Sequence, residues 1–193
     1  MIPKWGTMLD VGANLGITCA IAKRQRPDLN LIAFEPVPQN VRILRRIQSL
    51  YSIKKLELHA VAIGDEEGTV QFAVPTKGGV PATALSHLIS DEFKNPDVTM
   101  LPFARLEVKM QTLDSFGFGP VDAIKIDVED HEFHALKGAQ LLLAKFRPVV
   151  LCELWGTANR PRTIELMTSL GYVASQLGEI DFLFTPISTG AWK

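Results

Sequence analysis

Short apolar runs alternate along the chain with longer stretches in which apolar residues recur every three or four positions. The first pattern is typical of buried strands and the second of amphipathic helices. We predict strands at residues 7–11, 31–35, 56–63, 121–127 and 148–153. We predict helices at residues 16–26, 39–50, 131–145 and 162–170. Such alternation indicates an α/β fold with a parallel sheet covered by helices on both faces.

Two pairs of predicted strands depart from this alternation. Residues 172–176 and 181–184 are too close to enclose a helix, so we expect an antiparallel hairpin at the sheet edge. Residues 69–74 and 105–110 flank a long segment rich in proline and glycine. Loops of that length in compact domains are usually functional or disordered. We interpret residues 1–193 as a single domain with a loop or hairpin insertion at about 69–110, and we expect residues 75–104 to set substrate specificity.

The composition narrows the class of protein. The chain has 193 residues, of which 47% are hydrophobic and 21% charged, and its net charge is -1. These values are typical of a globular protein and argue against the basic surface that nucleic-acid binding needs. No apolar run approaches the ~20 residues that span a bilayer, and no apolar leader is visible. We predict that Cys19 and Cys152 are reduced core thiols, and we expect a cytoplasmic protein without a membrane or nucleic-acid partner.

A glycine-rich turn follows the first predicted strand and contains Asp10, Gly12, Asn14 and Gly16. Open α/β sheets bind ligands at this place, where glycine allows a tight turn and close approach to the backbone. The dinucleotide fingerprint G-x-G-x-x-G fails here, because Asn14 and Ile17 replace its second and third glycines. Glu35 ends the second strand, where an acid accepts hydrogen bonds from ribose hydroxyls. The pattern therefore predicts an adenosine-containing ligand without a pyrophosphate, which favours S-adenosylmethionine over NAD.

Five segments form a recognisable set: DVGANLG at 10–16, FEPVPQN at 34–40, AVAIGD at 60–65, TLDSF at 112–116 and KIDVEDHEFHALKGA at 125–139. Together they resemble the FkbM family of S-adenosylmethionine-dependent methyltransferases. The resemblance implies a Rossmann-like three-layer α/β/α sandwich, whose seven-stranded sheet has the order 3-2-1-4-5-7-6 and an antiparallel last strand. It also implies S-adenosyl-L-methionine as cofactor, S-adenosyl-L-homocysteine as product, and methylation of a hydroxyl on a sugar, glycan or natural product.

The resemblance further implies roles for single residues. Its cofactor-binding set is Asp10, Gly12, Asn14 and Gly16 for the methionine and ribose side, Glu35 for the ribose, Ala62, Ile63 and Asp65 beside the adenine, and Asp127 beside the methyl group. The chain departs from the family at Asp130, where most members have glycine. If this turn needs a positive φ, aspartate adopts it less readily than glycine but more readily than most residues.

Charged residues alternate in the fourth strand and its continuation. Lys125, Asp127 and Glu129 share one side of an extended strand. Charges at such positions are costly unless they pair or reach a pocket. Two interpretations therefore stand: an ion pair between Lys125 and Asp127, or contact of at least one of the three with cofactor or substrate.

A hydroxyl acceptor must lose its proton during methylation, and a positioned base accelerates such reactions ~10²–10⁴-fold. The catalytic candidates are Asp127, His131 and Glu153, which lie at or just after the ends of neighbouring strands. His134, one helical turn after His131, is expected to be solvated. We predict no metal site, although Asp127 and Glu153 carry the oxygen ligands that magnesium prefers.

Other classes of function remain as alternatives. A dinucleotide-dependent oxidoreductase is disfavoured by Asn14 and Ile17 in the glycine turn. A catalytically degenerate cofactor-binding module is disfavoured by the retained acids Glu35, Asp127 and Glu153. The oligomeric state is not predicted by any of these patterns.

Overall fold

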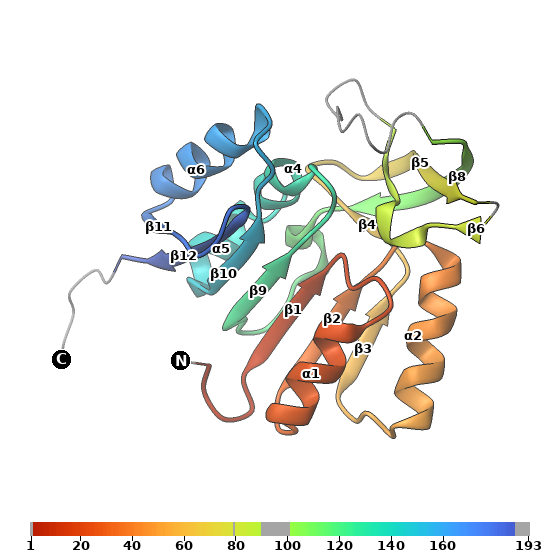
Figure 1. Ribbon diagram of the computed structural model, residues 1–193. Coiled ribbons are helices and arrows are strands. Elements are labelled where there is room, and N and C mark those ends of the chain that lie inside the picture. Colours follow the sequence, from red (N-terminus) through yellow and green to blue (C-terminus); the bar gives the residue numbers. More distant parts are fainter. Residues whose placement is uncertain (1, 79, 90–100, 188–193) are drawn as a thin grey trace.

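The computed structural model describes residues 2–78, 80–89 and 101–187. Seven strands form the larger sheet: β1 (Thr7–Val11), β2 (Asn30–Phe34), β3 (Leu56–His59), β9 (Ala123–Ile126), β10 (Val149–Glu153), β11 (Tyr172–Gln176) and β12 (Asp181–Pro186). Their order is β11-β12-β10-β9-β1-β2-β3, and β12 is antiparallel to both β10 and β11 (Figure 1). Numbered along the chain within this sheet, the order is 3-2-1-4-5-7-6. The expected topology and the antiparallel hairpin at the sheet edge are confirmed.

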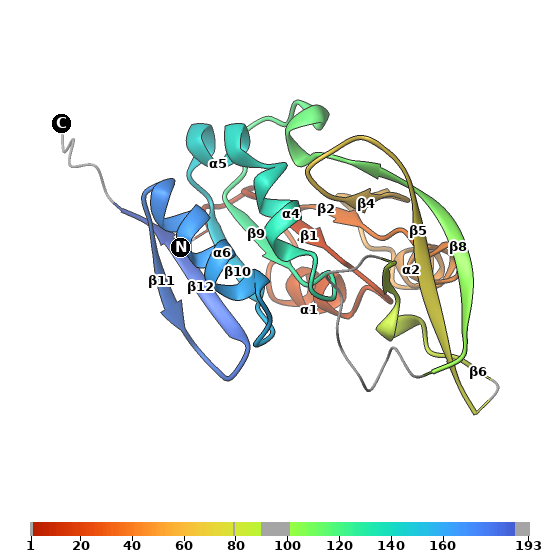
Figure 2. The same ribbon diagram turned by 90° about the horizontal axis from the view of Figure 1, so that it is seen from above.

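Among the described residues, five helices cover this sheet: α1 (Ile17–Gln25), α2 (Pro38–Leu50), α4 (Glu132–Lys137), α5 (Gln140–Phe146) and α6 (Asn159–Ser169). Seen from above, α1 and α2 lie on one side of the sheet and α4 and α5 on the other (Figure 2). Two apolar cores follow this division. One joins the strands to α4, α5 and α6, and the smaller one joins β2 to α1 and α2. The sheet is therefore buried on both faces, as its apolar strands predicted.

We predicted a single helix at residues 131–145. This prediction is wrong in one respect, because the segment forms two helices, α4 and α5. The chain leaves α4 at Gly138, where a Cβ atom would lie 2.0 Å from the carbonyl oxygen of Gly64. The carbonyl of Gly138 accepts a hydrogen bond from the amide of Asp114. A close backbone contact with another part of the chain therefore interrupts the helix, and local periodicity does not reveal it.

A second, smaller sheet lies beyond the carboxyl ends of the large sheet. It consists of β4 (Ala62–Ile63), β5 (Gly68–Lys77), β6 (Val80–Pro81), β7 (His87–Leu88) and β8 (Phe103–Gln111), with the 3-10 turn η1 (Thr83–Leu85) between β6 and β7. The order is β4-β8-β5-β6, and β7 pairs with β5. The strands expected at 69–74 and 105–110 are present as β5 and β8, which pair antiparallel. Residues 90–100 of the segment expected to set specificity lie outside the described residues.

The strand predicted at 56–63 is also divided. Its first part is β3 in the large sheet, whereas Ala62 and Ile63 pair with β8 in the second sheet. Ala62 packs there against Val108 and Met110. The two sheets are thus joined through this segment, and the second sheet forms a wall above the carboxyl ends of β1 and β2 (Figure 1).

Candidate active site

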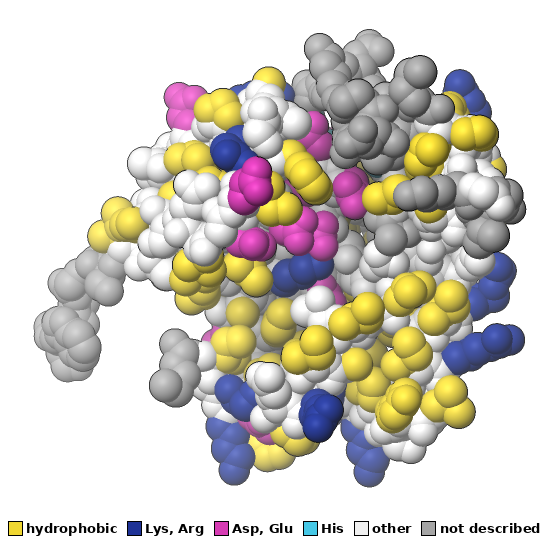
Figure 3. All heavy atoms as spheres, in the orientation of Figure 1, with side chains coloured by type: hydrophobic (Ala, Val, Ile, Leu, Met, Phe, Trp, Pro, Cys, Tyr) yellow, Lys and Arg dark blue, Asp and Glu magenta, His cyan; other side chains and the backbone are white. Residues whose placement is uncertain are grey.

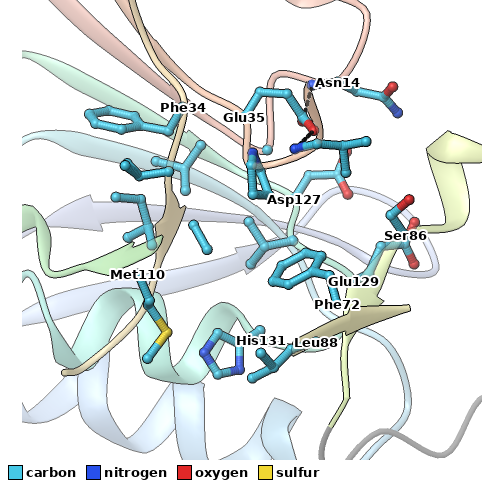
Figure 4. A pocket seen from close by; sticks show the side chains of 18 of the residues that line it. Asn14, Phe34, Glu35, Phe72, Ser86, Leu88, Met110, Asp127, Glu129 and His131 are labelled. Carbon is cyan, nitrogen blue, oxygen red and sulfur yellow. Dashed lines mark hydrogen bonds between the residues drawn. The ribbon is translucent and has the colours of Figure 1, made fainter. Parts of the chain in front are cut away.

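A cavity lies between the carboxyl ends of the large sheet and the second sheet (Figure 4). It encloses about 840 Å³ of empty space, counted with the part that is open to solvent. Turns after β1 and β2 contribute Gly12, Asn14 and Glu35 to its wall. The ends of β9 and β10 contribute Asp127, Glu129 and Glu153.

The glycine-rich turn owes its shape mainly to packing. Gly12 has a φ of 81°, and a Cβ atom there would lie 1.8 Å from the carbonyl oxygen of Asp127. Gly16 has a φ of 82°, and its Cβ would lie 2.8 Å from Cγ of Leu44. We expected these glycines to allow a tight turn with positive φ and close approach of a ligand to the backbone. The φ values fit the tight turn and the backbone of Gly12 lines the cavity, whereas the missing side chains would point toward β9 and α2.

Glu35 is held by three hydrogen bonds. Its Oε2 accepts from the amide of Asn14 at 2.9 Å, and its Oε1 accepts from the amide of Val37 at 2.9 Å and from Nδ2 of Asn40 at 3.2 Å. The residue is only 4% exposed, and burial raises the pKa of its carboxyl despite the three donors. An ionised carboxylate has about four acceptor positions, so one remains on Oε2. Glu35 therefore lines the cavity as a rigid acceptor with one position to offer.

Asn14 contributes a second acceptor. Its φ is 51°, a left-handed conformation that asparagine adopts more readily than most residues. Its side-chain Oδ1 is buried and has no hydrogen-bond partner among the described residues. A buried polar oxygen in a cavity wall is costly unless water or a ligand donates to it. The turn therefore holds an unpaired polar oxygen, on a residue that lines the cavity.

The ion pair between Lys125 and Asp127 is present, with 2.9 Å between Nζ and Oδ2. Lys125 Nζ also lies 3.8 Å from Oδ1 of Asp10, which is fully buried and whose Oδ2 accepts from Sγ of Cys19. Burial raises the pKa of the Asp10 carboxyl, and Lys125 opposes this shift. Asp127 both pairs with Lys125 and lines the cavity, so the two interpretations of this strand are compatible. Asp10 contacts the site through Lys125 and does not line the cavity itself.

Acidic side chains gather at the carboxyl ends of β9 and β10 (Figure 3). Burial, followed by the charges of Asp127 and Glu153, raises the pKa of Glu129 to about 7. Burial and the charge of Asp127 likewise raise the pKa of Glu153. Carboxyl groups whose pKa lies near the working pH are suited to accept and release protons.

His131 precedes α4 and lines the cavity, and its ring stacks on that of His134 with 4.6 Å between centroids. The expectation that His134 is solvated is wrong. Its Nδ1 lies 2.9 Å from Oδ1 of Asp65, and Lys137 Nζ donates to Oδ2 of Asp65 at 2.7 Å. These contacts hold Asp65 against α4, outside the lining of the cavity, whereas Ala62 and Ile63 belong to that lining. The link could not be read from the sequence, because His134 and Asp65 are 69 positions apart.

Three apolar residues of the second sheet complete the cavity, and sequence reasoning did not single them out. Phe72, Leu88 and Met110 come from β5, β7 and β8 and line the cavity together with Asp127 and Glu129 (Figure 4). They belong to strands outside the α/β alternation, so no motif or periodicity placed them near the glycine turn. Asn40 was also missed, although its burial inside a helix next to Glu35 is an unusual feature for an asparagine.

Neither a metal centre nor a membrane span is found within the described ranges. No three histidine, cysteine, aspartate or glutamate side chains there are grouped so as to hold a metal ion. None of the described helices is both long enough and apolar enough to cross a bilayer. Cys19 and Cys152 are free thiols, and both are buried.

The proteins and the family model that this chain matches are methyltransferases. A family model described as the methyltransferase FkbM domain matches residues 10–183. "Methyltransferase 1" of Beauveria bassiana is 25% identical over 143 residues, which cover 68% of this chain and 57% of that protein. Ribosomal RNA small subunit methyltransferase G of Desulfotalea psychrophila is 28% identical over 106 residues, which cover 52% of this chain and 48% of that protein.

A crystal structure of an FkbM methyltransferase from Methylobacillus flagellatus superimposes with a TM-score of 0.66 at 16% identity. The match covers 94% of this chain but 44% of that one. The chain therefore spans about half the length of the relatives that it matches, and at this identity the solved structure establishes the fold alone.

Proposed function

Because the chain belongs to the FkbM methyltransferase family, we propose that it is an S-adenosylmethionine-dependent enzyme that methylates a hydroxyl group. The proposed acceptor is a sugar, a glycan or a natural product. The observation that carries the proposal is Glu35, whose buried carboxylate lines the cavity and keeps one acceptor position that none of the described donors occupies. A fixed acceptor at the end of β2 suits the ribose hydroxyls of an adenosine-containing cofactor.

The residues present fit this cofactor. Glu35 would accept from the ribose, and the backbone of Gly12 with the unpaired oxygen of Asn14 would line the methionine side. Ala62 and Ile63 offer an apolar surface for the adenine. When bound, the cofactor would supply an electrophilic methyl group on a positively charged sulfur. That sulfur would keep the electron pair of the broken carbon–sulfur bond and become a neutral thioether.

The chain itself must position the acceptor and remove its proton. Glu153 is the proposed proton acceptor, because burial and the charge of Asp127 raise its pKa. Asp127 would orient the acceptor hydroxyl with Oδ1, since Lys125 already occupies Oδ2. His131, on the same wall, is the second candidate base. Phe72 and Met110 form the opposite apolar wall, which excludes water from the reacting groups.

The acidic wall also bears on the class of acceptor. Asp127, Glu129 and Glu153 line the cavity together, and a polyanion would meet their charges on entry. This favours an uncharged hydroxyl compound over a nucleic acid. One relative is named as a ribosomal RNA methyltransferase, so the test of the acceptor also includes a nucleic acid.

Calorimetric titration with S-adenosylhomocysteine tests the cofactor, with NAD as the control. We expect micromolar binding of the first and none of the second. Binding of NAD alone would replace the proposal with the oxidoreductase alternative. Transfer of a labelled methyl group to a panel of sugars, glycans, natural products and ribosomal RNA then tests the acceptor, and methylation of the RNA alone would overturn the proposed acceptor class.

A further inference from the structure

We propose that the Glu129 carboxylate makes this cavity prefer the positively charged methyl donor over the product, and that Glu129 is therefore a specificity-determining residue. The inference rests on the proposed function. Donor and product differ by one methyl group and by the positive charge on sulfur. A residue that binds one of these ligands more tightly than the other without contacting the methyl group must therefore interact with the positive charge on sulfur.

The backbone at Glu129 is held in a conformation that few residues adopt. Glu129 has a φ of 52° and Asp130 a φ of 67°, so two consecutive residues other than glycine are left-handed. Each such residue is strained, and the conformation persists only where surrounding contacts hold it. Strained turns of this kind occur preferentially at ligand sites. The contacts that hold this turn therefore show how the fold keeps Glu129 in place.

Three buried side chains hold the turn. Glu132 Oε1 accepts from the amide of Val128 at 2.9 Å, just before the turn. Asn159 Nδ2 donates to the backbone carbonyl of Asp130 at 2.9 Å. The Asp130 side chain accepts from the hydroxyl of Thr157, which ties the turn after β9 to the segment after β10. Asp130 is thus a structural part of the site.

The consequence is that Glu129 remains at the cavity although the strand has ended at Ile126. Figure 4 shows Glu129 near Ser86, beyond Asp127. Glu153 lines the same wall from β10. Of the charged groups that act on Glu129, Asp127, Glu153 and Asp130 are acids, and Lys125 is a cation that is already paired with Asp127. His131 is the neighbouring titratable group on the α4 side.

An excess of carboxylates in a partly buried cavity stabilises a bound cation. Burial and the neighbouring acids raise the pKa of Glu129 to about 7, so its charge changes within the pH range in which proteins are handled. A cation that lowers this pKa by one unit gains tenfold in affinity when Glu129 ionises. The uncharged sulfur of the product gains nothing from this ionisation.

The test is calorimetric titration of the whole chain with S-adenosylmethionine and S-adenosylhomocysteine at pH 6.0 and pH 7.8. For a one-unit lowering of the Glu129 pKa, we expect the ratio of the two dissociation constants to shift about fivefold toward S-adenosylmethionine at the higher pH, because Glu129 is partly ionised at both pH values. In Glu129→Gln the ratio should change clearly less, and the remaining change reports Glu153, His131 and the ligands' own amino groups. Glu66→Gln, an exposed acid outside the cavity lining, is the matched control and should behave like the parent protein.

A second variant addresses the turn. Asp130→Gly keeps a left-handed backbone accessible but removes the hydrogen bond with Thr157. We expect it to retain S-adenosylhomocysteine binding while the pH-dependent preference for the donor becomes smaller. A ratio that does not change with pH in the parent protein, or that changes equally in Glu129→Gln, would overturn the inference. Failure of both ligands to bind the parent protein would instead reject the proposed function.

Discussion

The backbone amide of Asn14 donates a hydrogen bond of 2.9 Å to Oε2 of Glu35. This bond joins the glycine-rich turn after β1 to the end of β2, so that two motifs 21 positions apart form one wall of the cavity. The same carboxylate holds the start of α2 through the amide of Val37. Glu35 therefore has a structural role in addition to its proposed role toward the ribose, and a test must separate the two.

Replacement of Glu35 should weaken cofactor binding. Glu35→Gln keeps the side-chain volume but loses the charge, and hydrogen bonds to charged groups contribute ~1.5–3 kcal/mol. We expect the dissociation constant for S-adenosylhomocysteine to rise about 10- to 100-fold in calorimetric titration. Glu66→Gln serves as control. If the folded variant binds as tightly as the parent protein, the ribose role of Glu35 is excluded.

Asp127→Asn should separate binding from methyl transfer. Asparagine has nearly the same shape as aspartate, so we expect S-adenosylhomocysteine binding to change only a few-fold. The rate of methyl transfer to an acceptor from the panel should fall ~10²–10⁴-fold, because orientation and proton removal lose a carboxylate. Glu153→Gln should show a comparable loss if Glu153 takes the proton. Activity near the parent level in Asp127→Asn would reduce Asp127 to the ion pair with Lys125.

Gly12→Ala should destabilise the fold. The added Cβ would lie 1.8 Å from the carbonyl oxygen of Asp127, and the φ of 81° disfavours any side chain. Overpacking and backbone strain together are expected to lower the free energy of unfolding by about 3 kcal/mol or more. Gly68→Ala is the matched control, because nothing lies within 4 Å of a Cβ at Gly68. Urea midpoints measure both variants, and equal midpoints would contradict the packing argument.

Glu132 should make stability depend on pH. Burial raises its pKa to about 8 in the folded chain, against about 4.3 for an exposed glutamate. Between these values the folded chain holds a proton that the unfolded chain has released, so the free energy of unfolding falls as pH rises from about 4 to about 8. Each unit of pKa difference is equivalent to about 1.4 kcal/mol.

Glu132→Gln removes this proton equilibrium but keeps a side-chain oxygen for the amide of Val128. We expect the variant to gain stability relative to the parent protein as pH rises from 5 to 8. Glu129 contributes a slope of the same sign in both proteins, so it cancels in the comparison. Urea unfolding at several pH values measures the difference. Parallel curves for the two proteins would show that Glu132 is not protonated in the fold.

Local pattern determined the strands of the large sheet. Residues 7–11 and 172–176 were predicted with the bounds that the structure has, and the strand order followed from the family resemblance. These predictions succeed because burial on both faces produces continuous apolar runs, and helical burial produces a period of three to four residues. The positions of Glu35 and Asp127 at strand ends could be predicted for the same reason, since the carboxyl ends of parallel strands share one edge.

Tertiary structure alone decided the rest of the cavity. The break at Gly138 arises from contact with Gly64, and Asp65 is drawn away from the cavity by His134 and Lys137. The wall formed by Phe72 and its neighbours depends on the pairing of β5 with β8. Each of these contacts joins residues that are tens of positions apart, and such pairings leave no period in the local sequence. The sequence by itself therefore determined the sheet and the acids along its edge, whereas long-range packing decided which of them face the cavity and what encloses them.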